Sequence, residues 1–188
     1  MRAPSHVTTR RQFLQAGAAL AASAAVIGPL AGAGYEDQGA DIGGFKVGMQ
    51  SYTYRQFSLE QTLKKIQDLG LGWVEFSNKH VNPASSPEQI KAVLNVCQEY
   101  KVKPIAFGVH TFTKNHDNNR KAFDFGKALG ITTLSADPSP DSFDSLDKLV
   151  AEYDIAIAIH PHGPIGGGKL HRWYSAEIIM DAVKDHHP

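Results

Sequence analysis

From Val47 onward, the chain alternates between two hydrophobic periods. Short apolar runs rich in β-branched and aromatic residues are each followed by a longer stretch with apolar residues every three or four positions. The short runs predict strands at residues 46–54, 73–77, 103–110, 131–137 and 155–160. The longer stretches predict helices at residues 58–70, 86–100, 118–130, 139–153 and 175–185.

The predicted helices carry recognisable end signals. Ser58 with Gln61, and Ser86 with Gln89, have the spacing of capping boxes, in which each side chain bonds the backbone of the other. Pro87 suits the first turn of its helix, and Gly130 suits a left-handed helix end. These signals indicate where the helices begin and end, and they support the alternation of strands and helices.

Strand–helix units of about 25–30 residues are typical of a parallel sheet with crossover helices. An open sheet that binds a dinucleotide carries G-x-G-x-x-G after its first strand, but the loop here reads SYTYRQFS. We therefore predict an α/β fold, a partial (β/α)8 TIM barrel with about five βα units. Because a barrel needs eight units, we expect a C-terminally truncated fragment; strands supplied by another copy are the alternative.

Residue parity within the predicted strands sorts side chains into two faces. In residues 155–160 the isoleucines share one face, while Ala156, Ala158 and His160 share the other. The same parity places Glu75, His110 and Asp137 on the inner face near the ends of their strands, where barrel active sites form.

Ionisable groups buried without partners would cost several kcal/mol each, and a shared divalent cation would offset that cost. Neighbouring side chains could instead satisfy each group. We predict catalytic roles for Glu75 and His110, and metal binding by Asp137 and His160. Candidate substrate-binding residues are Tyr52, Tyr54, His80 and His162.

The first 33 residues have the features of an export signal. Arg10 and Arg11 precede an alanine-rich apolar run that ends in Ala31-Gly32-Ala33, a small-residue cleavage pattern. The paired arginines resemble a twin-arginine signal, although an ordinary secretory signal or a membrane anchor would also fit. We predict a signal peptide at 1–33, a flexible leader at 34–45 and the barrel domain at 46–188, with export to the periplasm or beyond the cell.

Charge and cysteine content exclude several classes of function. The full chain has formal net charge +0, and loss of residues 1–33 leaves 16 basic against 19 acidic residues, which disfavours nucleic acid as a partner. The single cysteine, Cys97, excludes an internal disulfide and a cysteine zinc cluster. The stretch GPIGGGKL nearly matches a phosphate-binding loop, but Leu170 stands where Ser or Thr must be, so a lid over the barrel mouth is predicted instead.

Several stretches together resemble the sugar phosphate isomerase/epimerase family of the xylose isomerase-like TIM barrel superfamily, which also contains the type IV AP endonucleases. They are SYTYRQFSLEQTLKKIQDLGLGWVEF, KALGITTLSADP, KLVAEYDIAIAIHPHGP and IIMDAVKDHHP. The resemblance implies that His160 replaces a metal-binding Glu, and that Asp137-Pro138 replaces a Glu-Pro pair. It also implies further ligands beyond Pro188, beginning with an Asp-Thr-Gly-His strand.

The predicted function is therefore a metal-dependent sugar or keto-sugar isomerase/epimerase that abstracts a proton next to a carbonyl. The cofactor would be a divalent metal (Mn, Zn, Co or Mg), and the partner a small sugar, with no nucleic acid and no stable membrane span after processing. The alternatives are a lyase or hydratase on oxidised glycosides, an AP-endonuclease-like phosphodiester hydrolase, and a non-catalytic sugar-binding barrel.

Overall fold

A computed structural model describes residues 41–42, 44–164 and 166–186 of the chain. The predicted signal peptide at 1–33 and the first part of the leader lie outside these residues, as does Pro188. Within the described part, no helix combines the length and the apolarity needed to cross a bilayer.

The main element is a five-stranded sheet in the order β3-β4-β5-β6-β7, with every neighbouring pair parallel. Because sequential strands are also spatial neighbours, each crossover returns the chain beside the strand it left, as predicted. The strands are β3 (Gly48–Gln50), β4 (Trp73–Phe76), β5 (Lys103–Phe112), β6 (Thr133–Pro138) and β7 (Ala156–Ile159).

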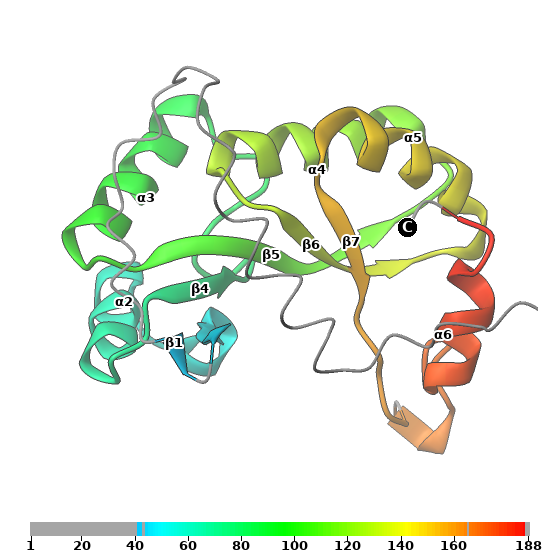
Figure 1. The fold of residues 1–188 in the computed structure, drawn as a ribbon, viewed down its shortest axis with the longest axis horizontal. Helices are drawn as coiled ribbons and strands as arrows, with labels where there is room; N and C mark the ends of the chain where they lie inside the picture. The colour runs from blue at the N-terminus through cyan, green and yellow to red at the C-terminus, as the bar shows by residue number, and fades with distance from the viewer. Residues whose placement is uncertain (1–40, 43, 165, 187–188) are drawn as a thin grey trace, which may run out of the picture. The chain divides into compact units, whose positions relative to one another are not determined.

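Helices follow the strands as expected, and Figure 1 shows α3, α4 and α5 along one side of the sheet. Both predicted capping boxes form, at Ser58 with Gln61 and at Ser86 with Gln89, and Gly130 ends its helix at φ 73°. The helices are α2 (Leu59–Asp68), α3 (Pro87–Glu99), α4 (His116–Leu129), α5 (Phe143–Tyr153) and α6 (Ala176–Val183).

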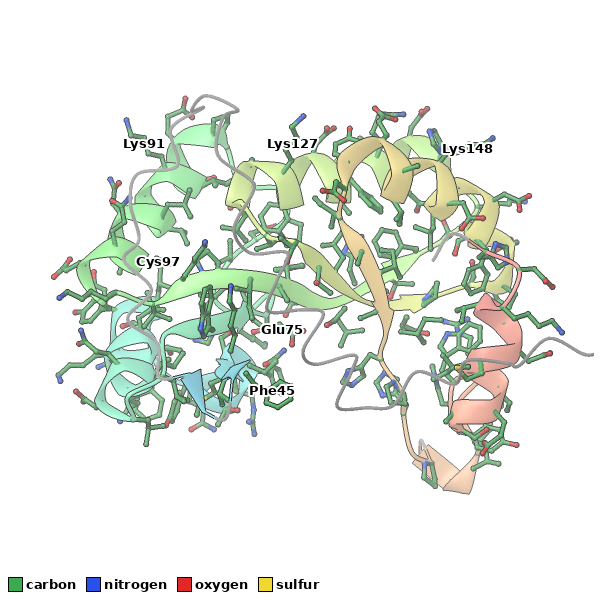
Figure 2. The ribbon with its side chains drawn as sticks, in the orientation of Figure 1. Phe45, Glu75, Lys91, Cys97, Lys127 and Lys148 are labelled. Carbon is green, nitrogen blue, oxygen red and sulfur yellow. The ribbon has the colours of Figure 1, made fainter. Side chains whose placement is uncertain are left out.

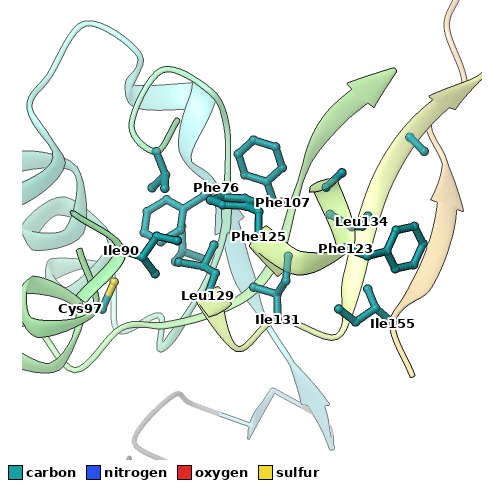
Figure 3. Close-up of a cluster of buried hydrophobic side chains, with 14 of the residues drawn as sticks. Phe76, Ile90, Cys97, Phe107, Phe123, Phe125, Leu129, Ile131, Leu134 and Ile155 are labelled. Carbon is teal, nitrogen blue, oxygen red and sulfur yellow. The ribbon is translucent and has the colours of Figure 1, made fainter. Parts of the chain in front are cut away.

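The hydrophobic core lies between the sheet and these helices (Figure 3). Phe76 of β4 and Leu134 of β6 are fully buried, and Phe107 of β5 packs edge-on against Phe125 of α4 with ring centroids 4.9 Å apart. Burial of such side chains is the main stabilising contribution to a domain of this kind. The helix-facing parity predicted for these strand residues is confirmed.

Two short strands precede the main sheet. Short strands β1 (Asp41–Ile42) and β2 (Phe45–Lys46) pair antiparallel across a tight turn in which Gly44 has φ 83°. These strands fall at the end of the predicted leader at 34–45, whose flexibility stays a prediction. Gly44 adopts the left-handed conformation that glycine tolerates without a steric penalty.

A register shift in β5 corrects the placement of His110. Simple alternation would set His110 opposite Asp137, but the shift between Phe107 and His110 sets Thr111 opposite Asp137 and His110 opposite Ala136. The His110 ring lies 4.8 Å from that of Phe112, which is fully buried beside α4. His110 therefore faces the helices and not the inner face, because a bulge reverses the parity of all residues after it.

Candidate functional site at the ends of β6 and β7

Asp137 and His160 lie on neighbouring strands at the carboxyl edge of the sheet. Asp137 is the penultimate residue of β6, and His160 follows β7 directly. The His160 N–H donates to the carbonyl of Ala136 at 2.8 Å, which extends the β6–β7 pairing to the first histidine. The predicted meeting of these two residues at one edge is thus observed.

Both carboxylate oxygens of Asp137 accept hydrogen bonds from Arg172. The distances are 2.9 Å from Nε and 2.9 Å from Nη2, which is the bidentate geometry of strong arginine–carboxylate pairs. Burial raises the pKa of Asp137, but the hydrogen bonds and charge of Arg172, with smaller contributions from His171 and His162, bring the pKa below its ordinary value. Asp137 is therefore a carboxylate near neutral pH.

Three imidazoles form a row beside this ion pair. The ring centroids of His160 and His162 are 4.8 Å apart, and those of His162 and His171 are 4.6 Å apart. Desolvation, followed by repulsion from His160 and His171, lowers the pKa of His162 despite the opposing attraction of Asp137. His162 is thus uncharged near neutral pH, as a metal ligand or hydrogen-bond acceptor must be.

His171 has both ring nitrogens engaged. Its Nδ1 accepts from the Trp173 backbone N–H at 3.2 Å, so in the neutral ring the proton is on Nε2, which lies 3.5 Å from Asp137 Oδ2. This residue therefore orients the neighbouring groups and has no free nitrogen of its own. His160 and His162 remain as the imidazoles available to a ligand.

Trp173 attaches the segment before α6, which contains Arg172, to the sheet through hydrogen bonds. Its side chain is buried, its Nε1–H donates to the Pro138 carbonyl at 3.0 Å, and its own carbonyl accepts from His162 N–H at 3.1 Å. One tryptophan thus links the ends of β6 and β7 to the segment before α6.

Sequence reasoning missed Arg172, His171 and Trp173. The stretch HRWY lies between a glycine-rich segment and α6, which begins at Ala176. The sequence signal available for these residues was a tryptophan next to an arginine and a histidine in a predicted loop, since functional residues often lie on loops.

Glu75 lies on β4, opposite Gln50 of β3 and Ala106 of β5 (Figure 2). It is half-buried, and within the described residues its carboxylate has no hydrogen bond or ion pair. Because β5 separates it from β6, it lies apart from the Asp137–Arg172 pair on the same sheet. Its predicted catalytic role stays a prediction.

Tyr52 and Tyr54 were expected on a strand, but they lie in a turn after it. β3 ends at Gln50, whose side-chain oxygen accepts from the Tyr52 N–H and starts a 3-10 turn, η2 (Ser51–Tyr54). Tyr52 is exposed with the Arg55 guanidinium 4.9 Å from its ring centre. The strand predicted over 46–54 is therefore too long, because the turn ends the alternation at Gln50. Substrate binding by the tyrosines stays a prediction.

His80, in the loop after β4, connects that loop to α2 and to the segment before α2. Its Nε2 lies 3.0 Å from Thr62 Oγ1 and 3.3 Å from the Phe57 carbonyl, which can only accept, so Nε2 carries a proton. The buried Nδ1 has no partner in the described structure. This geometry gives His80 a loop-positioning role and leaves its predicted contact with substrate a prediction.

The donor types at this edge, one carboxylate and two imidazoles, suit a divalent first-row cation. As arranged, however, no three His, Cys, Asp or Glu side chains among the described residues converge as a metal site. The Asp137 carboxylate has both of its oxygens bound to Arg172 instead.

No family model and no curated protein matches the chain. Solved structures do match. A putative uncharacterized protein from Parabacteroides distasonis is 27% identical with TM-score 0.65, covering 77% of this chain and 60% of its own. A xylose isomerase domain containing protein from Salmonella typhimurium is 15% identical with TM-score 0.53, covering 71% of this chain and 56% of its own.

D-psicose 3-epimerase, solved in the presence of D-fructose, is 13% identical with TM-score 0.53, covering 76% of this chain and 61% of its own. The five parallel strands and their helices have the fold of part of a (β/α)8 barrel. The chain spans about three fifths of the length of these solved structures, and the predicted partial barrel is confirmed. Structural neighbours thus include sugar epimerases of the xylose isomerase-like fold, a likeness at the level of fold.

Proposed function

We propose that the protein is a sugar or keto-sugar isomerase/epimerase that moves a proton next to a carbonyl with the help of a divalent metal. The observation that carries this proposal is the gathering of Asp137, His160 and His162 at the carboxyl edge of β6 and β7, the edge where barrel enzymes place their chemistry. The fold shared with sugar epimerases supports the substrate class.

Each group has a distinct part in this reaction. Glu75, a half-buried carboxylate without a partner in the described structure, would take and return the proton. His162, uncharged because its pKa is lowered, would accept a hydrogen bond from a substrate hydroxyl. Asp137 and His160 would hold the metal, which when bound would supply Lewis-acid stabilisation of the developing enediolate oxygens.

The proposal extends to the setting of the enzyme. Arg10 and Arg11 ahead of an apolar, alanine-rich run support export by the twin-arginine route. An exported enzyme would act on a sugar outside the cytoplasm, and further strand–helix units of a longer protein would complete the barrel. The net charge of zero counts against the phosphodiesterase alternative.

The test is solvent exchange. The protein is incubated in D₂O with a panel of ketoses that includes D-psicose and D-fructose, and deuterium incorporation next to the carbonyl is followed by NMR. We expect incorporation that chelator abolishes, and a loss of about 100-fold or more in Glu75→Gln, because positioned proton transfer contributes that much. Glu60→Gln, an exposed carboxylate on α2, is the matched control. Exchange that persists in chelator would contradict the metal-dependent mechanism.

A further inference from the structure

The ion pair of Asp137 and Arg172 presents its cation, and not its anion, to solvent. The side chain of Asp137 is 17% exposed, whereas that of Arg172 is 39% exposed. Arg172 uses Nε and one hydrogen of Nη2 for its two hydrogen bonds to Asp137. Its Nη1 and the second hydrogen of Nη2 have no partner among the described residues. The guanidinium therefore keeps a free edge with two parallel N–H donors.

Asp137 holds this free edge in one orientation. The guanidinium cannot turn without breaking two hydrogen bonds of 2.9 Å. An arginine that is already ordered loses less conformational entropy when it binds a ligand. Two parallel N–H donors match the two oxygens of a carboxylate, whereas a sugar hydroxyl offers a single oxygen. The free edge of Arg172 is therefore suited to a planar anion.

Attachment of the segment before α6 does not depend on this ion pair. Trp173 already donates to the Pro138 carbonyl and accepts from the His162 N–H. An ion pair with a solvent-exposed member contributes little stability by itself. Binding of a ligand therefore explains an oriented arginine at this edge better than attachment does.

Neutral hydrogen-bonding groups surround the pair. The register shift in β5 places Thr111 directly opposite Asp137, so that the two side chains share a face of the sheet. Thr111 is exposed, and its hydroxyl has no hydrogen bond within the described part of the chain. His162 lies beside His171, whose Nε2 is 3.5 Å from Asp137. Hydroxyl and imidazole groups can bond sugar hydroxyls, so one ligand could use them together with Arg172.

We infer that Arg172 binds the carboxylate of an acidic sugar, a uronate in its aldose or keto form, and that Thr111 bonds one of the hydroxyls of the same molecule. The inference rests on the proposed function for the sugar part of the ligand. It goes further by naming the charged class of substrate. It concerns how the substrate is bound and not how the proton is moved.

The experiment is calorimetric titration of the protein with D-glucuronate and D-galacturonate in the presence of chelator. The corresponding uronamides are neutral analogues of nearly the same shape, and D-glucose 6-phosphate tests phosphate in place of carboxylate. We expect at least one uronate to bind about tenfold more tightly than its amide, because the amide cannot accept two charge-assisted hydrogen bonds. D-glucose 6-phosphate should bind more weakly than that uronate.

Substitutions assign the binding to the named residues. Arg172→Lys keeps the charge but loses the two parallel donors, and should weaken uronate binding about tenfold. Thr111→Val keeps the shape and should weaken it about fivefold, through the loss of one hydrogen bond. Arg120→Lys is the matched control, because Arg120 forms the other two-bond pair with a carboxylate, with Glu152 on the helices, and should leave the affinity unchanged. Thermal melting of each variant verifies that the fold is intact.

Several outcomes would overturn the inference: no binding of either uronate, equal binding of uronate and amide, tighter binding of D-glucose 6-phosphate, or unchanged affinity in Arg172→Lys. The comparison of uronate with amide uses the unaltered protein, so it stands even where a variant does not fold. Uronate binding that depends on Arg172, without deuterium exchange in any sugar, would uphold the inference and refute the proposed function. Exchange in neutral ketoses without uronate binding would do the reverse.

Discussion

His110 is a half-buried imidazole on the helix side of β5, set there by the register shift. Burial lowers its pKa from the ordinary value of 6.5. In the unfolded chain the ring takes up its proton near that value, while in the folded protein it does so only at lower pH. Acidification therefore favours the unfolded state, and this cost is absent at pH values well above 6.5.

In the wild type, the free energy of unfolding should fall as the pH is lowered from roughly 7.5 to 5.5. We expect a smaller fall in His110→Gln, because the substituted side chain does not titrate. Urea denaturation at a series of pH values measures the slope for the wild type and the variant. Parallel pH profiles would show that His110 is not the group responsible.

Arg172 and Asp137 illustrate a different property of single residues. Each is an ordinary charged side chain in the sequence, and only their mutual position converts them into a bidentate pair. The ionisation of this edge therefore depends on the pair, because Arg172 is the main group that holds the pKa of Asp137 below its ordinary value.

At the scale of elements, the start of a helix can be specified by a few consecutive residues. Ser86 accepts from the Gln89 N–H while the Gln89 side chain accepts from the Ser86 N–H at 2.8 Å, and Pro87 occupies the first turn. All partners lie within four consecutive residues, so the sequence specifies the start of α3 without help from the rest of the fold.

Ser86→Ala should lower the free energy of unfolding by about 1 kcal/mol, because it removes the capping oxygen and leaves a helix N–H unpaired. Ser85→Ala is the matched control, since the Ser85 hydroxyl makes no hydrogen bond in the described structure. Equal effects of the two substitutions in urea denaturation would argue against the cap.

The register of strand β5, by contrast, is not specified by its own sequence pattern. Its alternation predicted that His110 would lie on the inner face, yet the ladder shifts between Phe107 and His110. A Cβ at Gly108 would lie 2.5 Å from the Ser135 Cβ, so the two strands approach more closely there than any other residue would permit. The shift depends on the neighbouring strand, which the pattern of β5 alone does not contain.

At the scale of the whole molecule, Trp173 holds the segment between β7 and α6 against the sheet. Its Nε1–H reaches Pro138, 35 residues earlier in the chain, and its ring packs edge-on against Phe143 of α5 with centroids 6.0 Å apart. The far end of α6 is fastened separately, by His186 Nδ1 at 2.8 Å from Asp147 and by stacking on Phe143.

Trp173→Phe should keep the packing against Phe143 but lose the hydrogen bond to Pro138, at a cost of about 1 kcal/mol. We expect faster proteolytic cleavage within residues 160–175, measured by mass spectrometry of timed digests. Trp73→Phe is the matched control, because the buried Trp73 Nε1 has no partner in the described part of the protein. Equal cleavage in the two variants would contradict the proposed role of Trp173 as a fastening.

The sequence by itself determined the order of strands and helices, the capped helix ends, the parallel sheet and the edge where Asp137 and His160 meet. These follow from hydrophobic period and local hydrogen bonding, which involve residues close together in the chain. Tertiary structure alone decided the face of His110, the early end of β3 and the pairing of Asp137 with Arg172. Each of these depends on contacts between segments that are distant in the sequence. The local hydrophobic pattern does not specify which distant residue makes such a contact.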